Sequence, residues 1–273
     1  SLDRRQRQMC IRDRYKLFQI DAFTSQRFRG NPACVVPLDS WLPDDILLNI
    51  AKENNVSETA FFIKKDDYFF IRWFTPEIEM DLCGHATLAA AYCLKNHLNY
   101  KNDYLKFDSN SGELIVKFEG QFIHMDFPHR KPLKSLLPSN IRDSLSIQPL
   151  EVLKSRDYVL VYENEKQIKD IVIDKELFNK KNIDPGGVVI TSTGLKSDFV
   201  SRYFVPQCSF FEDPVTGSTH CSLVPYWSER LNKTKLKSIQ LSERGGEMMC
   251  ENLGNRVLII GKAVTFSEGY LHI

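Results

Sequence analysis

The sequence predicts an α+β protein made of two similar halves that are related by a pseudo-twofold axis. Most of its apolar segments are short and alternate with polar residues, which is typical of strands. Each half also contains one apolar helical segment, beginning at Gly84 in the first and at Gly217 in the second. An apolar helix among many strands can bury itself inside a curved sheet or barrel. We therefore expect residues 15–130 and 131–273 to form two such units with a ligand cleft between them.

A repeated strand-turn-helix motif is the main evidence for the two halves. Residues 72–76 (RWFTP) align with residues 202–206 (RYFVP), and residues 83–86 (CGHA) align with residues 216–219 (TGST) after a short insertion. A turn of this kind places backbone N–H groups at the positive end of a helix dipole, which suits anions. We predict that the two helix starts face each other across a single site.

Turn residues and alternation divide the first half into elements. Residues 15–22 alternate as a strand does, and Gly30-Asn31-Pro32 follows as a strong turn signal. Pro43-Asp44-Asp45 opens a helix that Asn54-Asn55 closes. The helix from Gly84 is apolar nearly all round and should be buried. The other expected strands are 33–37, 59–63, 68–74, 104–107, 113–118 and 121–127.

The second half repeats this order after a Lys- and Pro-rich linker at residues 128–138. Its helix should run from Gly217 to about Asn232. A hairpin-like pair is expected around residues 243–246. The last strand, near the terminus, can pack back on the first half. The remaining expected strands are 158–162, 187–192, 199–204 and 256–261.

Composition excludes several classes of function. The 36 basic and 35 acidic residues give no electrostatic case for nucleic acid or a membrane surface, and no apolar run approaches the ~20 residues of a membrane span. The seven cysteines form no C-x-x-C pair, so we expect free thiols and a cytoplasmic location. Residues 1–14 carry five arginines without periodicity and are interpreted as a disordered or non-native extension.

Three ionisable residues lie where an element meets a turn in apolar surroundings. Glu58 precedes an apolar strand, and a carboxyl group facing an apolar cleft can exchange a proton near neutral pH; it can equally be a solvated turn carboxylate. His85, at a helix start, should be neutral because the dipole disfavours imidazolium; it can shuttle a proton or simply cap the helix. Asp213 precedes Pro214 and can orient a partner or serve only the turn.

Cys83 and the residues at the helix starts offer further possibilities. A thiol at a helix start can act as a base or nucleophile, but the repeat partner of Cys83 is Thr216, which argues against a two-cysteine mechanism. Ser218, the repeat partner of His85, can be a plain helix-start serine. A metal site from His85, His220 and Asp213 lacks the spacing of known metal motifs. The phosphate loop and G-x-G-x-x-G are absent from the sequence, so neither a metal nor a nucleotide cofactor is predicted.

Taken together, these segments resemble the phenazine biosynthesis PhzF-like family of the diaminopimelate epimerase-like superfamily. Each stretch is weak alone, but they occur in the family's order. The match spans most of the chain from Tyr15 and is poorest over residues 131–184. The matching stretches are 19–23 with 30–33, 57–60, 74–76 with 83–87, and 212–218.

The resemblance implies two halves, each a sheet rolled around a central helix, with the active site between them. It also implies isomerase chemistry without metal or organic cofactor. In the family's phenazine enzyme a glutamate moves a proton between carbons of a small carboxylate-bearing ring, and Glu58 matches that glutamate. His85 and Asp213 match the family's histidine and aspartate.

The same resemblance assigns the substrate-binding groups. Gly84, Gly217 and Ser218 match the backbone and hydroxyl groups that hold the substrate carboxylate. Cys83 stands beside them where the phenazine enzyme has alanine, so a thiol role stays open. The leading hypothesis is a cofactor-independent isomerase of a small carboxylate, with Glu58 as general acid/base. The alternatives are a thiol-dependent racemase or epimerase using Cys83, and a small-molecule binding protein. A homodimer through an exposed strand edge would fit the family.

Overall fold

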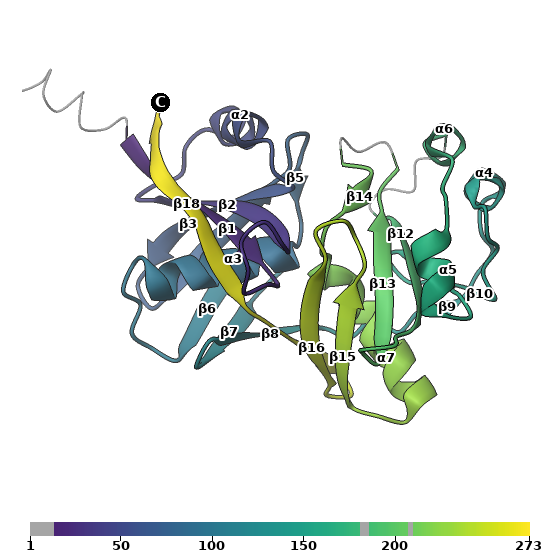
Figure 1. Ribbon diagram of the computed structural model, residues 1–273. Coiled ribbons are helices and arrows are strands. Elements are labelled where there is room, and N and C mark those ends of the chain that lie inside the picture. The colour runs from purple at the N-terminus through teal and green to yellow at the C-terminus, as the bar shows by residue number, and fades with distance from the viewer. Residues whose placement is uncertain (1–13, 181–185, 207–209) are drawn as a thin grey trace, which may run out of the picture.

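The structure, a computed structural model, describes residues 14–180, 186–206 and 210–273. Figure 1 shows two lobes joined by strands that run from one to the other. Most of the extension expected at residues 1–14, together with Cys10 and Cys208, lies outside the described residues. The one exception is Arg14, which the sequence interpretation placed in the extension but which begins the first strand, with its guanidinium over the ring of Tyr270. In the described part of the chain, each helix is too short or too polar to cross a membrane.

The elements expected in the first half are confirmed to within a few residues, including the helix from Asp44 to Asn54 and the helix from Gly84. The apolar character of the second helix is matched by its burial, since ten of its thirteen residues are buried. The elements are β1 (Arg14–Ala22), β2 (Asn31–Leu38), α2 (Asp44–Asn54), β3 (Glu58–Lys65), β4 (Tyr68–Phe74), β5 (Glu79–Met80), α3 (Gly84–Asn96), β6 (Tyr104–Asp108), β7 (Leu114–Glu119) and β8 (Phe122–Pro128).

The second half contains more than was predicted. The linker expected at residues 128–138 includes a short strand, and three short helices follow it before Phe178. The helix expected from Gly217 begins as a 3-10 turn and becomes α-helical at His220. The elements are β9 (Leu133–Lys134), α4 (Ser139–Ser144), β10 (Glu151–Lys154), β11 (Tyr158–Val161), α5 (Glu165–Asp170), α6 (Lys175–Phe178), β12 (Val188–Thr193), β13 (Phe199–Phe204), β14 (Glu212–Asp213), η1 (Gly217–Thr219), α7 (His220–Leu231), β15 (Lys235–Gln240), β16 (Gly246–Asn252), β17 (Arg256–Gly261) and β18 (Ala263–His272).

Strand pairing follows the same order in both halves. In the first, β2 is parallel to β3, β3 antiparallel to β4, β4 parallel to β6, and β6, β7 and β8 follow antiparallel. In the second, β11, β12, β13, β15, β16 and β17 repeat that series. The ladder between β8 and β17 joins the two series, and β18 returns to pair with β1. The predicted repeat is therefore a repeat of topology.

Matched ion pairs hold the two repeated turns. Arg72 donates two hydrogen bonds of 2.7 Å to the carboxylate of Glu79 across β4 and β5. Arg202 does the same with Glu212 across β13 and β14, at 2.7 and 2.8 Å. Bidentate pairs of this kind fix geometry as well as adding energy. Each one sets the path from a strand into the helix start that follows.

The central helices lie inside the curved sheet, and the other helices cover it from outside. One cluster of buried apolar side chains includes residues of both α3 and α7 and is continuous across the halves. A second cluster lies under α4, α5 and α6, and a third under α2. The strands β3, β11 and β12 are buried on both faces. Their sequences are therefore mostly apolar and do not alternate with polar residues.

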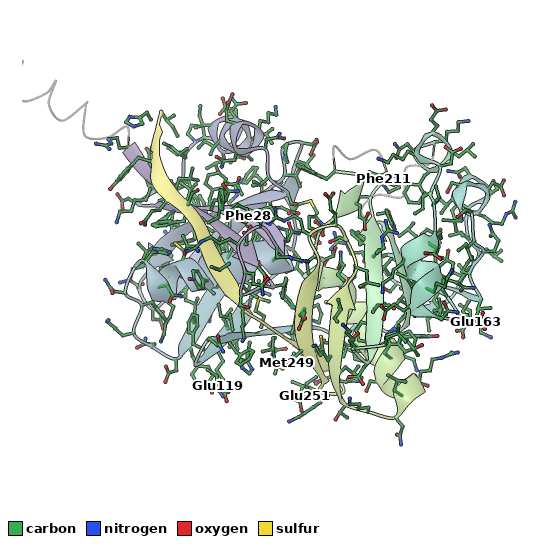
Figure 2. All side chains as sticks on the ribbon, in the orientation of Figure 1. Phe28, Glu119, Glu163, Phe211, Met249 and Glu251 are labelled. Carbon is green, nitrogen blue, oxygen red and sulfur yellow. The ribbon has the colours of Figure 1, made fainter. Side chains whose placement is uncertain are left out.

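The outer face of β18 is largely exposed. Phe28 is 70% exposed, and its ring meets that of Phe266 edge-on at 5.7 Å. Figure 2 shows Phe28 beside this strand. Among the described residues β18 pairs on one side only, with β1. The homodimer expected through an exposed strand edge stays a prediction.

Candidate active site

The two helix starts meet at the centre of the molecule, as predicted. A Cβ atom placed on Gly84 would lie 3.2 Å from the Cα of Gly217, so the two backbones are in contact. Among the described residues, no side-chain hydrogen bond caps either helix start. N–H groups at an uncapped helix start attract anions. Beside this contact lies a cavity of about 290 Å³, lined by residues of both halves.

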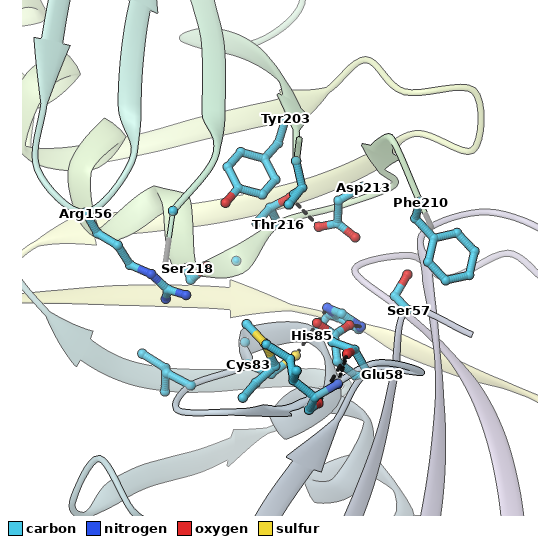
Figure 3. A pocket seen from close by; sticks show the side chains of 18 of the residues that line it. Ser57, Glu58, Cys83, His85, Arg156, Tyr203, Phe210, Asp213, Thr216 and Ser218 are labelled. Carbon is cyan, nitrogen blue, oxygen red and sulfur yellow. Dashed lines mark hydrogen bonds and ion pairs between the residues drawn. The ribbon is translucent and has the colours of Figure 1, made fainter. Parts of the chain in front are cut away.

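Glu58 and His85 form a close pair in the cavity wall. Asn55, in the left-handed conformation, ends α2, and the chain then enters β3 at Glu58. His85 is the second residue of α3. One oxygen of Glu58 lies 3.0 Å from Nε2 of His85, and the two side chains are 14% and 4% exposed. The first half therefore brings a carboxylate and an imidazole together, facing Asp213 across the cavity (Figure 3).

The surroundings of His85 oppose the expectation that its ring is neutral. Burial lowers the pKa of His85, but the neighbouring Cys83 and Glu58 outweigh it and raise that pKa well above its usual value. The direction of this shift favours the imidazolium, whereas the helix dipole alone would favour the neutral ring. The pair can pass a proton between its two members.

Asp213 brings a second carboxyl group from the other half. It ends β14, opposite Tyr203, and its repeat counterpart in the first half is Met80, opposite Trp73. Burial raises the pKa of Asp213 from 3.8 to about 6, against the lowering effect of His85. A group with a pKa near the working pH is well matched to proton transfer.

Asn31 connects these groups and was missed as a site residue. Its Nδ2 donates to Asp213 at 2.8 Å and to the carbonyl of Val215 at 2.9 Å, and lies 3.2 Å from Nδ1 of His85. Its Oδ1 accepts a hydrogen bond of 3.0 Å from Ser57. The only sequence signal was the turn Gly30-Asn31-Pro32, which indicates backbone geometry rather than a buried amide.

Thr216 and Cys83, which are repeat partners, hold different positions in the site. The Thr216 hydroxyl donates to Asp213, which fixes that carboxylate. Cys83 Sγ lies 3.5 Å from Nδ1 of His85. Burial and the charge of Glu58 raise the pKa of Cys83, against the lowering expected at a helix start. The thiol is therefore held in its protonated form.

The metal site considered from the sequence is not assembled. His220 is buried, and its ring nitrogens contact the Thr216 carbonyl and the Ser238 hydroxyl at 3.0 and 2.8 Å. Burial lowers the pKa of His220 to about 4, so it is a neutral core histidine. Glu58, Cys83 and His85 do bring possible ligand atoms within 4.8 Å of one another. A metal would require the Cys83 thiolate, which its raised pKa disfavours.

Every residue assigned to the site from the sequence lines this one cavity: Glu58, Cys83, Gly84, His85, Asp213, Gly217 and Ser218. Other lining residues were not anticipated, notably Arg156 and Tyr203. Arg156 lies in the stretch where the sequence offered no motif. Tyr203 was noted only as part of the repeated strand.

The five described cysteines, which are Cys34, Cys83, Cys93, Cys221 and Cys250, are free and buried, as expected from the sequence.

The fold and the site first define a class: an α+β protein with the diaminopimelate epimerase-like fold and with ionisable groups from both halves at one cavity. The family model for phenazine biosynthesis-like proteins matches residues 20–269. A protein of Pseudomonas aeruginosa named an uncharacterized isomerase is 46% identical over 257 residues, covering 94% of this chain and 98% of that protein. This chain belongs to the phenazine biosynthesis-like family, and it is an isomerase.

Solved structures agree. A phenazine biosynthesis protein of the PhzF family from Enterococcus faecalis has a TM-score of 0.90 at 41% identity, covering 95% of this chain and 100% of that one. A hydroxyproline epimerase from Agrobacterium vitis, 8% identical, has a TM-score of 0.62 and covers 96% of this chain and 93% of its own. The second match shows the fold alone.

Proposed function

We propose that this isomerase moves a proton between carbons of a small carboxylate-bearing metabolite without a metal or organic cofactor. Glu58 is the general acid/base that takes the proton from one carbon and returns it to another. His85 and Asp213 assist it. The substrate carboxylate lies against the helix starts at Gly84, Gly217 and Ser218.

One observation carries this proposal: an acid from each half and a shared imidazole face the same cavity beside two uncapped helix starts. Removing a proton from carbon leaves negative charge on the substrate, and the helix starts can hold that charge on the carboxylate oxygens. Glu58 then carries the proton, and the nearby His85 stabilises the carboxylate after its release.

The deciding experiment is deuterium exchange at carbon. A library of small carboxylates is incubated in deuterated water with the wild type and with Glu58→Gln, and mass spectrometry follows the exchange. The variant should lose roughly 10²- to 10⁴-fold in exchange rate, the usual contribution of one positioned acid/base. Glu77→Gln is a matched control, because Glu77 lines the same cavity but is exposed. If Glu58→Gln exchanges deuterium at the wild-type rate, Glu58 is not the general acid/base.

A thiol mechanism is the second candidate, because Cys83 lines the cavity within 3.5 Å of His85. Its raised pKa favours the first candidate instead. Cys83→Ala separates the two: a proton carried by Glu58 survives this substitution, whereas a thiol mechanism does not. Exchange that persists after dialysis against a chelator supports the absence of a metal.

A further inference from the structure

We propose that Arg156 binds the substrate carboxylate together with the helix start at Gly217-Ser218, and so restricts this isomerase to ionised carboxylates. This inference rests on the proposed function for the chemistry at Glu58. It adds a substrate-binding residue from a part of the chain without a family motif. It also narrows the substrate class, because neutral amides would be rejected.

Arg156 reaches the cavity from the second half. It lies in the turn between β10 and β11, its side chain is 12% exposed, and it lines the cavity. Figure 3 shows the guanidinium beside Ser218, on the side of the helix starts away from Glu58. An anion at the helix starts would therefore have Arg156 on one side and the acid/base group on the other.

The turn that carries Arg156 is firmly fixed. Asp157 accepts hydrogen bonds of 2.9 Å from both the Gly187 backbone and the Tyr203 hydroxyl. A Cβ atom on Gly186 would lie 2.5 Å from the carbonyl oxygen of Arg156, so the next strand packs directly against this turn. Because this turn is rigid, little conformational entropy is lost when the guanidinium of Arg156 binds a ligand.

The charges around the cavity favour an arginine for binding an anion. Glu58, Glu77 and Asp213 line it, whereas Arg156 is the one arginine or lysine among the described lining residues. Three carboxyl groups would repel a substrate carboxylate, and the His85 imidazolium and the partial charges of two helix starts only partly offset them. A guanidinium also matches the planar, two-oxygen shape of a carboxylate better than it matches neutral groups.

One ion pair of Arg156 can be displaced. The Nη2 of Arg156 lies 3.5 Å from Asp81, whose side chain is 56% exposed. An ion pair this long to a solvated carboxylate contributes little. A substrate carboxylate held by the helix starts can take the place of Asp81.

Calorimetry with simple probes tests the proposal. Acetate, benzoate and succinate, each paired with its neutral amide, are titrated into the full chain. The wild type should bind at least one carboxylate more tightly than its amide. Arg156→Met should weaken that carboxylate about 10- to 100-fold, the loss typical of a charge-assisted hydrogen bond. Arg156→Lys keeps the positive charge but loses the bidentate guanidinium, so its affinity for the carboxylate should lie between those of the wild type and Arg156→Met.

Lys154→Met is the matched control. Lys154 lies on β10, stacks on the Tyr158 ring and does not line the cavity, so its loss should leave carboxylate binding unchanged. Thermal melting of each variant reports whether it is folded. Failure of every carboxylate to bind the wild type, amide bound as tightly as carboxylate, or equal carboxylate binding by folded Arg156→Met would each overturn the proposal. If Glu58→Gln loses deuterium exchange while Arg156→Met still binds carboxylate as the wild type does, the proposed function holds and the role of Arg156 is refuted.

Discussion

Replacing Asp213 with asparagine should stabilise the fold while it impairs catalysis. Burial disfavours the ionised form of the Asp213 carboxyl group and raises its pKa from 3.8 to about 6. Asparagine has nearly the same shape and no charge. Its amide oxygen can still accept from Asn31, and its amide nitrogen can donate to the Thr216 hydroxyl. The variant therefore keeps the contacts and loses the ionisation.

The size of the effect depends on pH, and its sign follows from linkage. Below pH 3.8 both folded and unfolded chains hold the Asp213 proton, so its burial costs nothing through ionisation. Between 3.8 and about 6 the unfolded chain releases that proton before the folded chain does, so the wild type loses stability as pH rises. The loss is complete above about pH 7 and amounts to about 3 kcal/mol. The raised pKa already includes the attraction to His85. The weaker hydrogen bonds of a neutral amide reduce the expected net gain of Asp213→Asn to about 1–3 kcal/mol.

Urea unfolding at pH values from about 4 to 8 measures this difference. The gap between Asp213→Asn and the wild type should widen as pH rises to about 7 and then stay constant. Asp66→Asn, in the exposed turn between β3 and β4, should show no such trend. The reasoning is refuted if the Asp213 variant is no more stable than the wild type at neutral pH, or if its advantage does not vary with pH.

Three further outcomes follow from the structure. Gly84→Ala should reduce the exchange rate and cost about 1–3 kcal/mol in urea unfolding, because its methyl group would press on the backbone of Gly217. Arg202→Met should cost a similar amount by leaving Glu212 without its bidentate partner, and the double replacement of both residues should recover part of it. Phe266→Asp on the exposed face of β18 should convert a homodimer into monomers in sedimentation velocity.

Each of these outcomes has a clear contrary result. Full activity of Gly84→Ala would mean that the helix starts are not in tight contact at the site. If Arg202→Met is as stable as the wild type, the ion pair between Arg202 and Glu212 does not contribute to stability. A wild-type chain that sediments as a monomer at high concentration would remove the dimer prediction.

Where the sequence carried a local rule, it predicted the fold well. The repeated turns at 72–76 and 202–206 were predicted, but the ion pairs that hold them, Arg72 with Glu79 and Arg202 with Glu212, were found only in the structure. The helices α4, α5 and α6 were missed because each has only four to six residues, too few to show a helical period. They are held by the cluster beneath them rather than by their own sequence.

The sequence motifs identified which residues form the candidate site, but not how those residues change one another's charge and pKa. Motifs located Glu58, His85 and Asp213. The neighbours of His85 that raise its pKa could not be foreseen, because its partner Glu58 lies 27 positions away and only folding places it at 3.0 Å. Asn31 and Arg156 were missed for the same reason, since a buried amide or guanidinium gains its role from neighbours that are distant in sequence.

The pairing of β18 with β1 affects how the chain is made. Residues 14–22 lie beside residues 263–272, so the first half gains this covering strand only after the residues between them, including the second half, have been synthesised. Until then the edge of β1 stays open, and open strand edges favour association with other chains. We expect refolding to be slow, with a late step that closes β18 onto β1, since pairing between distant segments lowers folding rates.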